Sequence, residues 1–208
     1  AAGQGIATRL SAEIVSLNMA SRNASDAQAM IDTADGAYQE VHSMLLRMRE
    51  IAVQASNGTL SGADRTALNA EVTALETEIT SIAANTAFGG INLGTSTAVT
   101  FQIGTKNGNT LDHTFVNFNT ATLGADVSVG TATGARSALA TIDAAISTAS
   151  TNRGALGALS NRLSSTIANL DNVSVNLSSA RGRIQDTDFA QETSNLAKSQ
   201  IMQQAATA

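Results

Sequence analysis

The sequence predicts a mainly α-helical protein: an elongated antiparallel helical bundle or coiled coil of long N- and C-terminal helices, with a small β-hairpin region. Apolar residues recur at alternating spacings of three and four near both ends of the chain, which is typical of helices sharing one packed seam. The 208 residues include no Pro, the residue that breaks helix interiors. Residues 97–118 change to a period of two, which is typical of strands.

We expect the first helix to run from about residue 5 to residue 56. At about 1.5 Å per residue it would be roughly 75–80 Å long, and it would need partner helices to be stable in water. Its stripe is weak before Ile31, where small and polar residues occupy seam positions, so we expect a looser contact there. The strong stripe consists of Ile31, Ala34, Tyr38, Val41, Leu45, Met48, Ala52 and Ala55, and the weak one of Leu10, Ile14, Leu17, Ser21, Ala24 and Gln28.

A second, antiparallel helix is expected up to about Asn85. Asn57-Gly58 ends the first helix, because both residues tolerate the left-handed conformation. Ser61 is a predicted N-cap, with Asp64 three residues later. Residues 86–90 form a predicted turn. The stripe of this helix is Leu68, Val72, Leu75, Ile79 and Ile82.

Residues 97–118 form a predicted β-hairpin around residues 106–109. A two-residue loop at Asn107-Gly108 would pair Ile103 with Asp112, which sets an apolar residue opposite a polar one. An odd-length loop, for example three residues with a bulge, pairs Ile103 with Leu111 or Phe101 with Phe115. We therefore expect the odd-length loop.

The last long helix is expected to start between residues 134 and 137, after a loop with a short strand at 127–129. Its seam runs through Leu156, Leu159, Leu163, Thr166, Leu170, Val173, Leu177, Ala180 and Ile184. Asp186-Thr187-Asp188 then interrupts the pattern. Either Asp188 caps a new helix, or these residues are an exposed polar turn within one helix.

These elements suggest four parts. We expect residues 1–93 to be the N-terminal helical part of a core domain and 94–133 a short central hairpin and loop region. Residues 134–185 would be the C-terminal helical part of the same domain, and 186–208 the start of a further C-terminal segment. The chain begins without Met and ends within a predicted helix, so we expect it to be cut at both ends.

Composition excludes several classes of protein. The chain has no Cys, which excludes disulfides, thiol catalysis and cysteine metal ligands. A net charge of −5 argues against a general nucleic-acid binder or a basic membrane-surface helix. No apolar run reaches the roughly 18 residues that a membrane span needs.

Catalytic and cofactor motifs are not found in the sequence. It contains no phosphate-binding loop, dinucleotide fingerprint, zinc-protease motif or nucleophile elbow. His42 and His113 are far apart in the chain, and Asp186 and Asp188 lack a third ligand nearby. We expect no enzyme, and no catalytic, cofactor or metal site. The mixed charges of residues 47–50 favour a solvated helix face, with a specific contact as the alternative.

Several stretches at both ends of the chain carry a family resemblance. The N-terminal ones are AAGQGIATRL, NMASRNASDAQ and TADGAYQEVHSMLLRMREIAVQASNGTLS, and the C-terminal one is LGALSNRLSSTIANLDNVSVNLSSARGRIQDTDFAQETSNLAKSQIMQQA. These stretches resemble bacterial flagellin, the subunit of the flagellar filament. The resemblance implies a secreted, extracellular structural protein that self-assembles into a motility filament, with paired terminal helices inside and the middle outside. It also implies further terminal helices that line the filament channel, which we expect to be missing here, and a flagellar cap and export chaperone as partners of the full-length protein.

The stretch LLRMREIAVQ resembles the motif by which Toll-like receptor 5, an innate immune receptor of animals, recognises flagellins. The resemblance implies that Arg47 and Glu50 are exposed receptor or inter-subunit contacts, with Ile51 where Leu is common. Glu78, in LETEITSIA, would be the matching acidic contact.

Two other readings remain open at this point. A hook–filament junction or cap-like protein shares helical ends with flagellin, and a cytoplasmic coiled-coil rod is a third option without a hairpin. The runs RNASDAQ, LRMREIAVQ and SARGRIQDTDFAQE favour flagellin proper. We expect that a chain without its terminal helices stays a soluble monomer.

Overall fold

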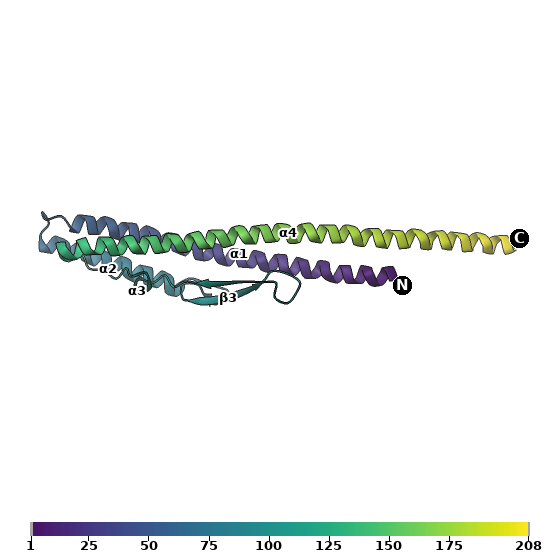
Figure 1. Cartoon of the computed structure of the whole chain (residues 1–208), viewed down its shortest axis with the longest axis horizontal. Coiled ribbons are helices and arrows are strands. Elements are labelled where there is room, and N and C mark those ends of the chain that lie inside the picture. Colours follow the sequence, from purple (N-terminus) through teal and green to yellow (C-terminus); the bar gives the residue numbers. More distant parts are fainter. Residues whose placement is uncertain (1, 208) are drawn as a thin grey trace. The chain divides into compact units, whose positions relative to one another are not determined.

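The computed structural model describes the backbone of residues 2–207 and the side chains of residues 3–185 and 193–206. Its elements are α1 (Ala2–Ala55), α2 (Gly62–Asn85), β1 (Ala87–Phe88), β2 (Ile91–Asn92), β3 (Thr97–Gln102), β4 (Thr110–Phe115), α3 (Thr120–Leu123) and α4 (Ala132–Thr207) (Figure 1). The chain divides into unit 1 (Ala1–Ser25, Gln102–Leu111 and Ser164–Ala208) and unit 2 (Asp26–Phe101 and Asp112–Leu163). Within each unit α1 and α4 run antiparallel, which confirms the predicted mainly helical fold.

The core of unit 2 is built on the strong stripe of α1. Every residue predicted for that stripe is at most 2% exposed. In this unit α1 has two helical neighbours, since Arg47 bonds to Glu71 of α2 and Arg49 bonds to Asp143 of α4. Because two neighbours cover α1, its buried arc is wider than one seam and takes in Ile51 as well.

Unit 1 has a thinner core. Leu17 and Ala20 of α1 pack with Leu170 of α4, and Leu177 is partly buried against them. Val173, a predicted seam residue, is 37% exposed. Polar bonds supply much of the remaining contact between the helices: Ser21 to Asp171 at 3.0 Å, Ser174 to Asn18 at 2.9 Å and Arg181 to Ser11 at 3.2 Å. The looser contact expected for the first half of α1 is what the structure shows.

The start of α2 and the turn after it follow the predicted local chemistry. Ser61 is the N-cap of α2 and forms a full capping box with Asp64. Beyond α2, Phe88 pairs with Ile91 across a two-residue turn of Gly89 and Gly90. Both glycines have positive φ, +56° and +85°, which is the conformation that a tight hairpin turn requires.

The hairpin of β3 and β4 has the expected parity. Residues with odd numbers face inward on both strands, and Leu111 and Phe115 are 3% and 2% exposed. The N–H of Ile103 donates to the carbonyl of Asn109 at 3.0 Å, so five residues lie between them. The odd-length loop is confirmed, with five residues in place of the three taken as an example. The predicted pair of Ile103 with Leu111 is wrong, because Ile103 is bonded to Asn109.

The strand predicted at residues 127–129 is wrong. This segment is not part of a strand, and side chains of α2 accept hydrogen bonds from its backbone. Glu76 Oε1 accepts from the N–H of Val127 and Asn69 Oδ1 from the N–H of Val129, both at 2.8 Å. Burial raises the pKa of Glu76, while its bond to Val127 lowers it. The sequence also did not predict α3, a single turn capped by Asn119 and ended by Gly124.

The last helix is one element of 76 residues, and it starts at Ala132, slightly before the predicted range. Its backbone stays helical through residues 186–188. The alternative in which Asp188 caps a new helix is therefore wrong, and the side chains of Asp186 and Asp188 lie outside the described residues. Among the helices that the structure describes, none is both long and apolar enough to cross a membrane.

Tyr38 ties three segments of unit 2 together. Its hydroxyl donates to the carbonyl of Val116 at 2.9 Å and accepts from Nδ2 of Asn152 at 3.2 Å. Its ring lies 4.5 Å from the ring of Phe118. Burial raises the pKa of Tyr38 from 10.0 to about 12, because ionisation would leave a phenolate in an apolar site.

Replacing Tyr38 with Phe is expected to lower the free energy of unfolding by about 1–2 kcal/mol, because Val116 and Asn152 lose a buried partner. In the parent protein, Tyr38 ionises at lower pH in the unfolded state than in the folded state. Its contribution to stability is therefore complete below pH 10 and is lost as pH rises to 12. Urea unfolding across this range measures the effect, and an equal alkaline loss in Y38F would contradict it.

Candidate interaction surface

Groups suited to catalysis or metal binding do not gather in the described structure. In the part of the chain that it describes, no three His, Asp or Glu side chains are placed to hold a metal ion. His42 is half-buried on α1. His113, on β4, lies edge-on to Phe115 at 4.8 Å, and burial lowers its pKa. Among the described side chains, neither histidine belongs to such a group.

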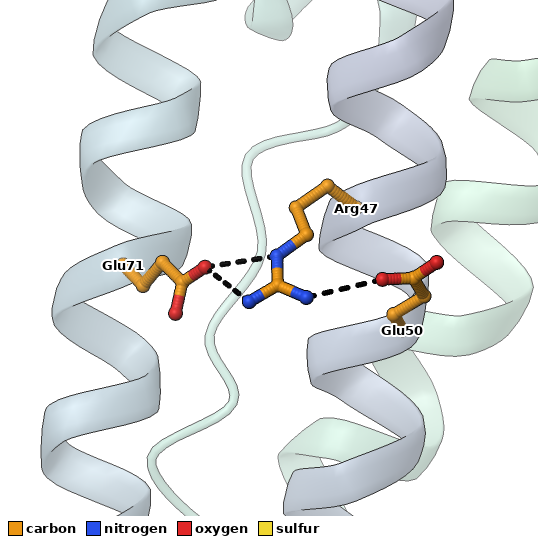
Figure 2. A network of polar contacts seen from close by, with 3 residues as sticks. All are labelled: Arg47, Glu50 and Glu71. Carbon is orange, nitrogen blue, oxygen red and sulfur yellow. Dashed lines mark hydrogen bonds and ion pairs between the residues drawn. The ribbon is translucent and has the colours of Figure 1, made fainter.

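Arg47 is the centre of a charged network between α1 and α2 (Figure 2). Its Nε and Nη2 donate to Oε1 of Glu71 at 2.9 and 2.7 Å, and its Nη1 donates to Oε2 of Glu50 at 3.1 Å. The bonds to Glu71 and then to Glu50 raise the pKa of Arg47 further above its usual range. The side chains of Arg47, Glu50 and Glu71 are 52%, 69% and 42% exposed, so a partner can reach all three.

The predicted contact residues are brought together only in part. Arg47 and Glu50 are exposed and paired with each other. Ile51 is 1% exposed and packs inside unit 2. Glu78 is exposed on α2, seven residues beyond Glu71, so the two carboxylates share one face of that helix two turns apart.

Glu71 is the residue that sequence reasoning missed. It precedes the stripe residue Val72, as Arg47 precedes Met48 on the antiparallel helix. Opposite charges next to the apolar stripes of two helices that pack together are a sequence signal that would have suggested the ion pair of Arg47 and Glu71. Exposed apolar side chains adjoin it on α1, since Leu46 is 43% and Val53 is 49% exposed. We name the set of Leu46, Arg47, Glu50, Val53, Glu71 and Glu78 the α1–α2 surface.

Unit 1 carries a second set of uncovered side chains. The described side chains of residues 193–206 in α4 are all exposed. Large apolar side chains among them and nearby are exposed to solvent. We name these residues the unit 1 apolar set: Ile6, Val15 and Met19 of α1, and Val173, Val175, Leu196, Ile201 and Met202 of α4.

Two family descriptions match most of this chain. Residues 1–97 match the bacterial flagellin N-terminal helical region, and residues 139–208 match the bacterial flagellin C-terminal helical region. The chain belongs to the bacterial flagellin family. A flagellin of Halalkalibacterium halodurans is 42% identical over 215 aligned residues, which cover all of this chain and 78% of that protein. Flagellin A of Vibrio cholerae is 29% identical and is covered over 84% of its length.

Solved structures extend the comparison to the fold. The crystal structure of Bacillus cereus flagellin matches with a TM-score of 0.67 and 29% identity, over 72% of this chain and 88% of that chain. A flagellar hook-associated protein from Vibrio parahaemolyticus matches with a TM-score of 0.74 over 85% of this chain and 95% of that chain. Its identity is only 15%, so it shares the fold alone.

The family settles the function that the sequence predicted. This flagellin is a structural, non-enzymatic subunit of the extracellular flagellar filament, and it polymerises with other flagellin subunits to serve motility. The junction or cap alternative is not supported, because the family matches and the identities point to flagellins.

Proposed function

We propose that this flagellin contacts its neighbours through the unit 1 apolar set and through the α1–α2 surface. The observation that carries the proposal is that unit 1 has few buried apolar side chains and many large exposed ones. Its buried hydrophobic side chains come from α1 and α4, with Leu111 of β4, while most of the large apolar side chains exposed in the described structure belong to this unit. Helices with such uncovered groups gain free energy when copies of the chain cover them.

The geometry of assembly follows from symmetry. A contact that joins different faces of two identical subunits produces a helical filament when its repetition does not close into a ring. In this proposal the helical parts, residues 1–93 and 134–185, lie inside the filament, the segment from residue 186 leads inward, and residues 94–133 face outward. The flagellar cap and the export chaperone remain partners of the full-length protein.

The α1–α2 surface is the proposed recognition site for Toll-like receptor 5 as well as a contact between subunits. Arg47 is held in one orientation by Glu50 and Glu71, so a partner meets a preorganised guanidinium flanked by the apolar side chains of Leu46 and Val53. Arg flanked by apolar groups is a common centre of binding energy in protein interfaces. Ile51 supports this surface from beneath.

Replacing Arg47 with Ala is expected to weaken binding to the ectodomain of this receptor about tenfold or more, with little change in the thermal midpoint of the subunit. Surface plasmon resonance with purified monomer measures the affinity. E71Q and E78Q test which acidic residue supports the site, and E71Q is expected to have the larger effect because Glu71 contacts Arg47.

The matched control is Arg49→Ala, since Arg49 lies two residues away but pairs with Asp143 of α4. Equal losses of affinity in R47A and R49A would indicate a general effect of positive charge and would contradict a specific site. Receptor binding unchanged in R47A would remove Arg47 from the proposal.

A further inference from the structure

The chain contains two Asn-Gly pairs, Asn57-Gly58 and Asn107-Gly108, which differ in their surroundings. In such a pair the backbone nitrogen of Gly can attack Cγ of the Asn side chain, which forms a C–N bond and expels the amide nitrogen as ammonia. Water then opens the cyclic imide at either carbonyl and leaves Asp or isoaspartate. Glycine favours the reaction because it has no Cβ to shield its nitrogen.

The pair at residues 57 and 58 is held by hydrogen bonds. Oδ1 of Asn57 accepts from the N–H of Thr59 at 3.2 Å, and this bond restricts rotation of the Asn57 side chain. The carbonyl of Asn57 accepts from Nη2 of Arg65 at 2.8 Å, and the N–H of Asn57 donates to the carbonyl of Gln54. Attack by Gly58 requires several of these bonds to open together.

The pair at the tip of the β3–β4 hairpin is held far less. Asn107 and Gly108 are exposed, and within the described residues the side chain of Asn107 makes no hydrogen bond. Two backbone bonds close the loop around the pair, from the N–H of Asn109 to the carbonyl of Lys106 at 3.1 Å and from the N–H of Ile103 to the carbonyl of Asn109 at 3.0 Å, and neither uses an atom of Asn107 or Gly108. Gly108 has φ +84°. A Cβ built on either Gly108 or Gly58 would meet nothing within 4 Å, so the two pairs differ in the hydrogen bonds of the Asn and not in the space beside the Gly.

We propose that the hairpin tip is a site of spontaneous deamidation, and that Asn107 is converted to Asp and isoaspartate while Asn57 is protected. The conversion adds a negative charge next to Lys106. These residues line an open hollow together with Val15 and Met19 of α1. The isoaspartate product also adds a methylene to the backbone within the turn. The exposed surface at this tip thus changes its charge with the age of the subunit, without an enzyme.

The experiment follows both sites in one sample. The full chain is incubated at body temperature and mildly alkaline pH, digested at acidic pH, and mapped by mass spectrometry with enzymatic detection of isoaspartate. Asn57 must open one or two more hydrogen bonds than Asn107, so Asn107 is expected to react about tenfold faster in the folded protein. In urea the two rates are expected to converge.

Variants separate the site from other sources of acidic charge. N107Q is expected to abolish the new acidic band on isoelectric focusing, because Gln forms a less favourable ring, while N57Q leaves that band unchanged. Deamidation of Asn57 as fast as Asn107 in the folded protein would overturn the proposal. So would an intact Asn107 in the folded protein after the urea sample has reacted.

Discussion

Replacing Val175 with Asp is expected to lower the rate of filament growth at least about hundredfold while the subunit itself stays folded. Val175 is 64% exposed on α4 in unit 1. If a neighbouring subunit covers it, the substitution buries an unpaired carboxylate in an apolar contact, which costs several kcal/mol. In the free subunit, Val and Asp have similar helix propensities, so the free energy of unfolding is expected to change by about 0.5 kcal/mol or less.

Growth is measured by adding protein, made with the terminal segments of a complete flagellin, to sheared filament seeds and assaying the high-speed pellet. Electron micrographs of the pellet check that growth is filamentous. The matched control is Val116→Asp, which introduces the same charge at an exposed Val of unit 2. Normal growth of V175D would remove Val175 from the proposed contact, and equal failure of V116D would indicate a general effect of charge.

The second large effect is expected in the core of unit 2. Replacing Leu45 with Ala should lower the free energy of unfolding of that unit by about 3 kcal/mol, because Leu45 is fully buried and its removal leaves a cavity. Leu170 of unit 1 is 8% exposed in a core of few residues, where neighbours can collapse into the space. L170A is therefore expected to cost less, about 2 kcal/mol.

The two units need separate readouts, because a single unfolding midpoint is not defined if they open independently. Hydrogen exchange followed by mass spectrometry assigns the loss of protection to peptides of each unit. L45A is expected to raise exchange in α1 after residue 26 and in α2. A smaller loss in L45A than in L170A would contradict the assignment of the main core to unit 2.

Local chemistry is enough to determine the three long helices and the buried face of α1. The alternating spacing of three and four residues between apolar positions predicted a buried stripe on α1, and every residue of that stripe is buried. The prediction succeeds because side-chain direction along a helix follows from sequence position. The capping box at Ser61 and the odd-length hairpin loop were also predictable, since each depends on residues close in sequence. The stretches at both ends indicated the family.

Contacts between distant segments were decided by the tertiary structure. An apolar stripe predicts which face of a helix is buried, but it does not predict which residue of another helix lies opposite. The contact of Arg47 with Glu71, and not with Glu78, therefore became visible only in the tertiary structure. The N–H groups of Val127 and Val129 donate to side chains of α2 and not to a neighbouring strand. The polar residues 186–188 did not end α4, because no Pro or Gly interrupts it there and polar residues are compatible with a helix. The sequence by itself thus determined the three long helices, the buried stripe of α1 and the family, while the pairing of charges across helices depended on the register that packing sets.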